Sequence, residues 1–113
     1  MKNNHISYIE FITNDLEKIK SFYQKVFGWD FKDYGPDYAS FSESGVYGGF
    51  SLTDEKIVNG TLVVLYHQDL KATINKIVEA GGKISKEIFS FPGGSRFHFM
   101  DPSGNELAVW SDQ

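Results

Sequence analysis

The sequence predicts an α+β fold made of two tandem copies of a βαβββ unit. Two amphipathic, helix-like segments carry the same residues at their ends, because the distance from Asp15 to Asp69 and the distance from Gly28 to Gly82 are both 54 residues. Each of these segments follows a short apolar run and precedes further runs typical of strands. This repeated order predicts two modules of similar shape, with the helices outside two mixed sheets.

The first helix-like segment, residues 14–28, has a recognisable start and end. Asn14 is predicted to cap the free N–H groups, and Glu17, three residues later, completes a capping box. Gly28 is predicted to take the left-handed conformation that ends a helix. One face of this helix carries apolar residues at three- and four-residue spacings, namely Leu16, Ile19, Phe22, Tyr23, Val26 and Phe27.

The strands of the first module are predicted from alternating side chains and from the turn residues between them. They cover Ser7–Ile12, Trp29–Tyr34, Tyr38–Ser42 and Val46–Thr53. Gly48 and Gly49 are adjacent inside the last of these runs, and we expect a bend there. The alternative is that another group approaches the backbone closely at this point.

The second module follows a polar connection at residues 54–60, which is too short to separate independent domains. The two halves are therefore expected to share one core. A strong hairpin signal, Asp101-Pro102-Ser103-Gly104-Asn105, lies between the last two predicted strands. The predicted elements are a strand at Thr61–Tyr66, a helix at about Leu70–Ala80 with an apolar stripe of Leu70, Ile74, Ile77 and Val78, and strands at Lys83–Phe89, Arg96–Met100 and Glu106–Trp110, with Gly82 ending the helix.

Length and charge limit the classes of function. The 113 residues are enough for one domain, residues 1–113, with module one at about 5–53 and module two at about 61–111. A formal net charge of −4, with acidic and basic residues mixed along the chain, argues against a nucleic-acid partner. The chain has no cysteine, its first residues lack the apolar core of a signal peptide, and no apolar run reaches membrane-spanning length. We expect a cytoplasmic protein with no membrane partner.

Two stretches resemble a known family. They are D-L-E-K-I-K-S-F-Y-Q-K-V-F-G-W at Asp15–Trp29 and F-M-D-P-S-G-N-E-L at Phe99–Leu107. Together with the repeated βαβββ order, they resemble the vicinal oxygen chelate superfamily, which includes glyoxalase I, extradiol dioxygenases and the bleomycin- and fosfomycin-resistance proteins. The similarity is greatest to a glyoxalase-like subgroup without a defined activity. The resemblance implies curved mixed sheets that form a cup around a small molecule, and a homodimer, since dimers are frequent in the family.

The resemblance also implies positions for a divalent metal, which this sequence does not fill with metal ligands. The family places ligands at positions that correspond here to Tyr8, to about Leu62, to Ala108 and to a residue of the fourth strand, where Val46–Thr53 contains no His, Glu or Asp. Leu and Ala have no donor atom, and neutral Tyr is a poor ligand. We therefore expect no cofactor, with a divalent metal only in the alternative described below.

Strand alternation, with the family's ligand position marking the inward face, selects the side chains that would line the cup. The predicted ligand-binding residues are Tyr8, Glu10, Tyr66, Arg96, His98 and Trp110. Aromatic rings with a few polar groups are the usual character of a small-molecule site. The alternatives are that the aromatic residues belong to the core, that Glu10 and Arg96 form a structural ion pair, and that His98 is neutral and inert.

Two classes of function follow. The first is a metal-free module that binds a planar, aromatic or anionic small molecule. The second is a lyase, isomerase or dioxygenase that uses either a displaced metal set of Glu10, His98 and Glu106, or Glu10 and His98 as acid and base. We favour binding, because the usual ligand positions lack donors and the predicted cup is aromatic. The three histidines (His5, His67 and His98) are also widely separated and form no metal-binding spacing.

Overall fold

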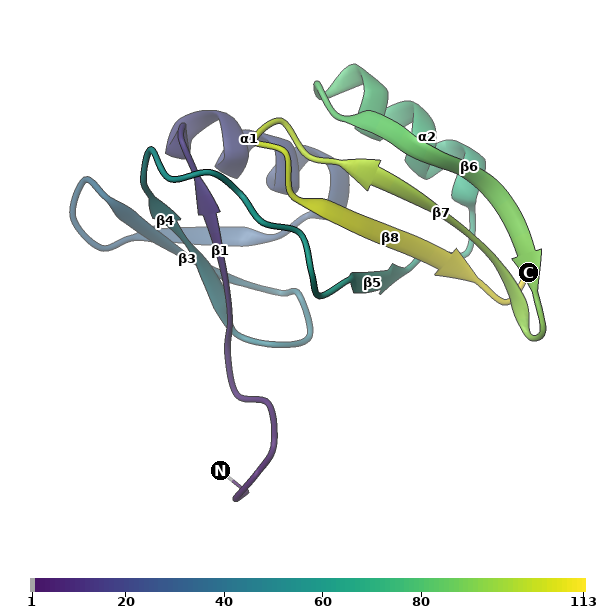
Figure 1. Ribbon diagram of the computed structural model, residues 1–113, viewed down its shortest axis with the longest axis horizontal. Coiled ribbons are helices and arrows are strands. Elements are labelled where there is room, and N and C mark those ends of the chain that lie inside the picture. The colour runs from purple at the N-terminus through teal and green to yellow at the C-terminus, as the bar shows by residue number, and fades with distance from the viewer. Residues whose placement is uncertain (1) are drawn as a thin grey trace.

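A computed structural model describes residues 2–113 and confirms the α+β fold of two βαβββ modules (Figure 1). The first module consists of β1 (Ile9–Thr13), α1 (Leu16–Phe27), β2 (Asp30–Asp33), β3 (Tyr38–Ser42) and β4 (Gly48–Leu52). The second consists of β5 (Val63–Tyr66), α2 (Leu70–Glu79), β6 (Lys83–Phe91), β7 (Gly94–Met100) and β8 (Glu106–Ser111). Within the described part of the chain, neither helix is long and apolar enough to cross a membrane.

The two modules have the same sheet topology. The strand order is β1-β4-β3-β2 in one sheet and β5-β8-β7-β6 in the other. In both, the first strand of the module runs parallel to the last, and the other neighbours are antiparallel. The predicted duplication is therefore present in the hydrogen-bonding pattern as well as in the order of elements.

The N-terminal caps of the helices are the two repeated aspartates. Asp15 has an extended backbone, and its carboxylate accepts a hydrogen bond from the backbone N–H of Lys18 at 3.1 Å. Asp69 also has an extended backbone, and its carboxylate accepts a hydrogen bond from the backbone N–H of Ala72 at 3.0 Å. The prediction of Asn14 as the cap is wrong by one residue, because the carboxylate of Asp15 already binds the free N–H group three residues ahead.

The C-terminal ends of the helices differ from each other. Gly28 takes the predicted left-handed conformation, with φ 73°. In the second module the left-handed residue is Gly81, with φ 99°, so the prediction that Gly82 ends the helix is wrong. Gly82 has another role, because a Cβ there would overlap the side chains of Ile77 and Phe22. It allows α2 and α1 to pack closely.

One residue of the predicted α2 stripe is also misplaced. Leu70 and Ile77 are buried as expected, and Ile74 packs against the core. Val78, however, is 56% exposed, whereas Thr73 is buried and donates a hydrogen bond to the backbone oxygen of Asp69. A hydroxyl that is satisfied within its own helix can be buried at little cost.

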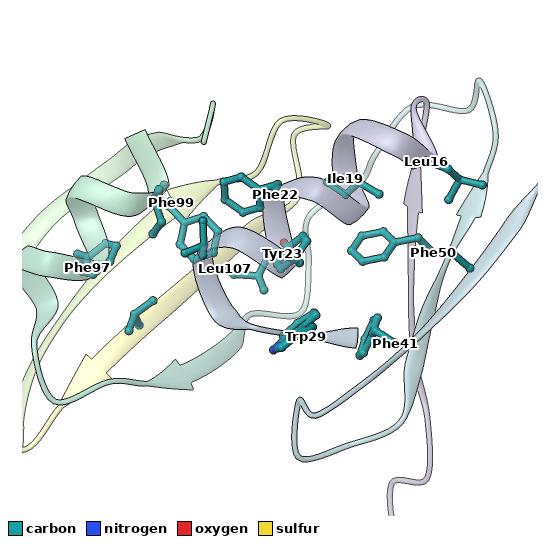
Figure 2. Packing of buried hydrophobic residues seen from close by; sticks show 14 of the residues in the cluster. Leu16, Ile19, Phe22, Tyr23, Trp29, Phe41, Phe50, Phe97, Phe99 and Leu107 are labelled. Carbon is teal, nitrogen blue, oxygen red and sulfur yellow. The ribbon is translucent and has the colours of Figure 1, made fainter. Parts of the chain in front are cut away.

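A single aromatic core joins the two modules. Figure 2 shows α1 in the middle, with Phe41 and Phe50 of the first sheet on one side and Phe99 of the second sheet on the other. Tyr23 of α1 is fully buried, and its ring stacks on Trp29 at 4.7 Å between centroids. The connection between the modules is short, and residues of both modules belong to one buried cluster.

The glycine pair in β4 does not mark a bulge, and it lies where other groups approach the backbone closely. The pairing of β3 with β4 shows no register shift at Gly48 or Gly49. A Cβ on Gly48 would overlap the ring of Phe41, and a Cβ on Gly49 would overlap the hydroxyl groups of Tyr38 and Tyr8. The alternative of close approach to the backbone is correct on both faces of the sheet.

The turn between β7 and β8 is built around a buried carboxylate. Asp101 accepts hydrogen bonds from the backbone N–H groups of Ser103, Gly104 and Asn105 at 2.9–3.0 Å, and from the Asn105 side-chain amide at 3.0 Å. It also accepts a hydrogen bond at 2.8 Å from the hydroxyl of Tyr23 in the other module. Burial raises the pKa of Asp101, and these donors oppose the increase.

The same turn contacts the end of β1. The side-chain amide of Asn105 donates to the backbone oxygen of Ile12 at 3.0 Å, and the hydroxyl groups of Thr13 and Ser103 lie 2.6 Å apart. Polar contacts from one turn thus reach both α1 and β1 of the first module.

We predict that Asp101→Ala lowers the free energy of unfolding by about 3–5 kcal/mol, because it leaves the buried Tyr23 hydroxyl and several N–H groups without an acceptor. Tyr23→Phe, which removes one of these hydrogen bonds, is expected to cost about 1–2 kcal/mol. Urea denaturation followed by circular dichroism measures both. The matched control is Asp54→Ala, at an exposed position in the connection. A loss under 1 kcal/mol for Asp101→Ala would show that the turn does not hold the modules together.

Candidate functional site

The six predicted ligand-binding residues lie on the faces of the sheets that point away from the helices. On the first sheet, Glu10 lies in β1 and Tyr8 lies just before it. The other four, in the second sheet, are Tyr66 in β5, Arg96 and His98 in β7, and Trp110 in β8. The residues that alternate with them, such as Phe97 and Phe99, are fully buried in the core. Within this chain the six residues therefore form two groups, one on each sheet.

The group on the first sheet is a chain of hydrogen bonds between exposed side chains. The hydroxyl groups of Tyr8 and Tyr38 lie 2.6 Å apart, and the Tyr38 hydroxyl donates to Glu10 Oε1 at 2.9 Å. Because the single proton of Tyr38 is used in this bond, Tyr8 is the donor to Tyr38. Desolvation and the hydrogen bonds to Tyr8 and Glu10 raise the pKa of Tyr38. The Tyr38 hydroxyl is therefore neutral, and the chain of hydrogen bonds ends at the Glu10 carboxylate.

The sequence reasoning missed Tyr38. Its signal was present, because Tyr38 alternates with the buried Ala39 and Phe41 of β3 and so faces outward like Tyr8.

The group on the second sheet consists of aromatic rings around Arg96. The guanidinium carbon of Arg96 lies 5.3 Å from the ring centre of Phe89 and 5.9 Å from that of Phe91. Trp110, the direct cross-strand neighbour of Arg96, lies 6.4 Å from Phe91 and 5.2 Å from Tyr66 between ring centroids. The Arg96 guanidinium therefore makes cation–π contacts with the surrounding aromatic rings.

Phe89 and Phe91 were also missed by the sequence reasoning. The alternation of β6 is imperfect because its pairing with β7 shifts register between Ile84 and Lys86 and again between Lys86 and Phe89. Only after these shifts do the two rings come opposite Arg96 and Gly94. A pattern read with a fixed period of two cannot locate them.

The suggested ion pair between Glu10 and Arg96 does not form. Glu10 binds Tyr38 in the first sheet, and Arg96 stacks on phenylalanine rings in the second. Among the described residues, Arg96 has no carboxylate within ion-pair distance, and its Nε is buried without a hydrogen-bond partner.

His98 lies beside Arg96 on the same face and is held by Glu106. Its Nδ1 lies 3.2 Å from Glu106 Oε2, and Ser85 donates to the same carboxylate oxygen at 3.2 Å. His98 is 9% exposed, and its Nε2 is buried without a partner. Arg96 Nε and His98 Nε2, on successive outward positions of β7, therefore both lack a hydrogen-bond partner.

The residues present do not fit the family's metal site. Ala108 is fully buried between its cross-strand neighbours Val64 and His98, and its methyl group offers no donor. The hydroxyl of Tyr8 is engaged with Tyr38. Leu62, like Ala108, has no ligand atom.

The displaced metal set of Glu10, His98 and Glu106 does not come together either. His98 and Glu106 are in contact, but Glu10 hydrogen-bonds within the other sheet. In residues 2–113 no three His, Asp or Glu side chains lie close enough to hold a metal ion. Within one chain, these three side chains therefore do not form one ligand set.

Clefts between the sheets contain only part of the predicted set. One cleft of about 750 Å³ includes Tyr66 in its lining, together with residues of α1, β1 and β5. Another, of about 390 Å³, lies under the connection between the modules and is lined by Glu10 and Glu106. Arg96, His98 and Trp110 line neither of these two clefts.

Comparison with known proteins identifies relatives of the whole chain. Residues 5–109 match the model of the glyoxalase/bleomycin resistance protein/dioxygenase superfamily. A glyoxylase-like domain-containing protein from Didymella fabae is 31% identical over 95% of this chain and 93% of its own length. The chain spans less than half the length of the other curated relatives that it matches.

Solved structures show the same fold at low sequence identity. A family enzyme from Burkholderia phytofirmans has a TM-score of 0.83 at 17% identity, covering 95% of this chain and 98% of its own. The fosfomycin resistance protein FosX from Listeria monocytogenes has a TM-score of 0.83 at 18% identity, covering 97% of this chain and 94% of its own. At this level of identity, the likeness concerns the fold alone.

Proposed function

Because this chain belongs to the glyoxalase/bleomycin resistance protein/dioxygenase superfamily, we propose that it binds a small planar anion on the outward face of β6, β7 and β8. The observation that carries this proposal is the pair of buried, unpartnered nitrogens on β7, Arg96 Nε and His98 Nε2. A buried polar group without a partner costs about 1–3 kcal/mol, which a ligand acceptor would recover. A carboxylate or similar oxygen acid supplies acceptors for both.

The rings around Arg96 favour a flat ligand. Phe89, Phe91 and Trp110 surround the guanidinium, and none of these three carries a charge that would oppose an anion. Aromatic faces stack on planar groups with specific geometry and large buried area. The Arg96 guanidinium can bind a carboxylate through two parallel hydrogen bonds.

Binding in this proposal does not use a divalent metal. The positions where the family holds one are filled here by side chains without suitable donors, including Ala108 and Leu62. The charge on the ligand is balanced instead by Arg96. Fosfomycin resistance is a property of FosX. The residues here support sequestration of a ligand rather than its metal-dependent conversion.

The cup is closed by a second copy of the chain. Tyr8 and Tyr66 are 45% and 51% exposed, and the acidic group around Glu10 lies on a different sheet from Arg96. In a two-fold homodimer the first sheet of one protomer can face the second sheet of its partner, and the contact then occurs twice. This pairing places Glu10 near the Arg96 surface and covers exposed aromatic rings on both sides.

A second candidate function is acid–base catalysis at the same place. Glu106 fixes one nitrogen of His98 at 3.2 Å, and the other nitrogen is left without a protein partner. A histidine oriented by a carboxylate is a common general base, and a lyase or isomerase reaction would need only such proton transfers. Catalysis would be established if the protein converted a bound ligand and His98→Gln abolished this turnover while the dissociation constant stayed within about twofold. If the ligand remained unchanged over hours, only the binding function would stand.

For the binding site we predict that Arg96→Ala and Trp110→Ala each weaken binding of 2-naphthoate, a planar aromatic carboxylate. The expected loss is about 1–3 kcal/mol for each, which is roughly five- to 150-fold in the dissociation constant. Isothermal titration calorimetry measures it, and prior treatment with EDTA is expected to change nothing.

The matched control for Arg96→Ala is Lys32→Ala. Lys32 also lies over an aromatic ring, that of Tyr34 at 5.2 Å, but on the first sheet. Equal affinity of the wild type and both site variants, with all proteins folded, would refute the site; loss of binding after EDTA would refute the metal-free mechanism.

For the homodimer we predict a species of twice 12.8 kDa in sedimentation at micromolar concentration. If the cup closes across protomers, a mixture of Tyr8→Ala and Trp110→Ala chains forms heterodimers in which one of the two cups has both residues intact. Such a mixture is expected to regain part of the 2-naphthoate binding that each variant lacks alone. A monomer that binds 2-naphthoate with full affinity would contradict this assembly.

A further inference from the structure

A separate cleft of about 750 Å³ opens at the boundary between the two modules, away from Arg96 and His98. It lies between the C-terminal end of α1, the strand β1 and the strand β5. Its volume is in the range of small-molecule pockets. We propose that this cleft binds a small amphipathic anion, an alkyl carboxylate whose chain lies in the cleft and whose carboxylate lies at the mouth.

The walls of the cleft are apolar because two sheet edges meet there. β1 pairs only with β4, and β5 pairs only with β8, so the core-side residues of both edge strands have no strand beyond them. Phe11, Val63 and Leu65 are consequently only half-buried, although they pack against the core. Trp29 and Phe41, with ring centroids 4.5 Å apart, line the same cleft. These walls can bury an alkyl chain.

The charged side chains of the cleft lining are two lysines and one glutamate, so its charge is positive overall. Lys25 and Lys76 come from the last turns of the two helices, and neither has a carboxylate within ion-pair distance among residues 2–113. His67 accepts a hydrogen bond from the Asp69 N–H at Nδ1, so its proton is on Nε2, which is then a donor. Glu43 is the opposing acidic group in the lining. In a chain of net charge −4, this combination selects an anion over a neutral or cationic amphiphile.

The proposal is independent of the planar-anion site. Arg96, His98 and Trp110 do not line this cleft, and Tyr66 alone of the predicted set does. Loss of ligand binding at one place would therefore leave the other intact.

The probe is decanoate, and Trp29 supplies the signal. The chain has two tryptophans, so Trp110→Phe leaves Trp29, which lines the cleft, as the sole emitter. Decanoate is expected to shift Trp29 fluorescence saturably, below its micelle concentration, and with lower affinity at high salt. Decyltrimethylammonium, with the same chain length and the opposite charge, is expected to bind at least about threefold more weakly.

Two double variants, both made in the Trp110→Phe protein, test the mouth of the cleft. The double variant Lys25→Gln, Lys76→Gln is expected to weaken decanoate binding roughly three- to tenfold. The control double variant Lys18→Gln, Lys71→Gln lies on the same two helices but outside the cleft, and it is expected to change decanoate binding less than about twofold. Both pairs are checked for their melting temperatures, because Lys25 and Lys76 also stabilise helix C-termini.

The wall is tested at Val64, which is 42% exposed and lines the cleft. Val64→Glu is expected to abolish decanoate binding, while Val78→Glu, at an exposed position on α2 outside the cleft, leaves it unchanged. Equal affinity for decanoate and decyltrimethylammonium, no saturable signal, or identical effects of the test and control variants would each overturn the proposal. The proposal would also be overturned if the protein bound anionic vesicles but not free decanoate, or if dimer formation displaced decanoate.

Discussion

The buried carboxylate of Asp101 is the contact on which the arrangement of the two modules depends. It belongs to the turn between β7 and β8, yet one of its donors is the hydroxyl of Tyr23, a fully buried residue of α1. A charge removed from water needs several hydrogen bonds, and Asp101 has five. Because these donors come from both modules, the hairpin has one position relative to α1, and the outward residues of β7 have one position relative to the first sheet.

The aromatic core and the outward faces depend on residues of very different size. Tyr23, Trp29 and Phe41 stack in series inside the domain, and their large rings fill the space that a small core would leave empty. On the outward side, Gly49 leaves room for the hydroxyl groups of Tyr8 and Tyr38 to lie close to the backbone. Ala108 leaves a shallow position between Val64 and His98. These faces are suited to stacking and hydrogen bonding, because the small residues leave room for the larger side chains beside them.

The duplicated topology also explains why the chain has more than one candidate surface. Each module ends in a sheet whose first strand has a neighbour on one side only. At the boundary between the modules these two edges leave a cleft with apolar walls, and the opposite faces carry exposed aromatic residues. Both features come from the same cause, because two open sheets of four strands cannot cover all of each other's apolar surface within one chain.

Sequence alone was sufficient for the fold, because its signals are local. The aspartate repeated 54 residues apart, the apolar stripe of α1 and the Asp-Pro turn each depend on near neighbours, and all three predicted the order of elements correctly. The family followed from the same motifs. The direction of Tyr8, Arg96 and Trp110 followed from strand alternation together with the ligand position that the family resemblance supplied.

The partners of the site residues depended on tertiary structure. Register shifts in β6 bring Phe89 and Phe91 to Arg96, and no fixed period contains that information. Glu10 bonds to Tyr38 in its own sheet, whereas Arg96 lies in the other sheet, and pairwise charge matching cannot foresee this separation. The close contacts at Gly49 and Gly82, and the burial of Thr73 in place of Val78, likewise depend on which side chain arrives from a distant element. Local chemistry thus determined which residues face outward, and long-range packing decided what each of them touches.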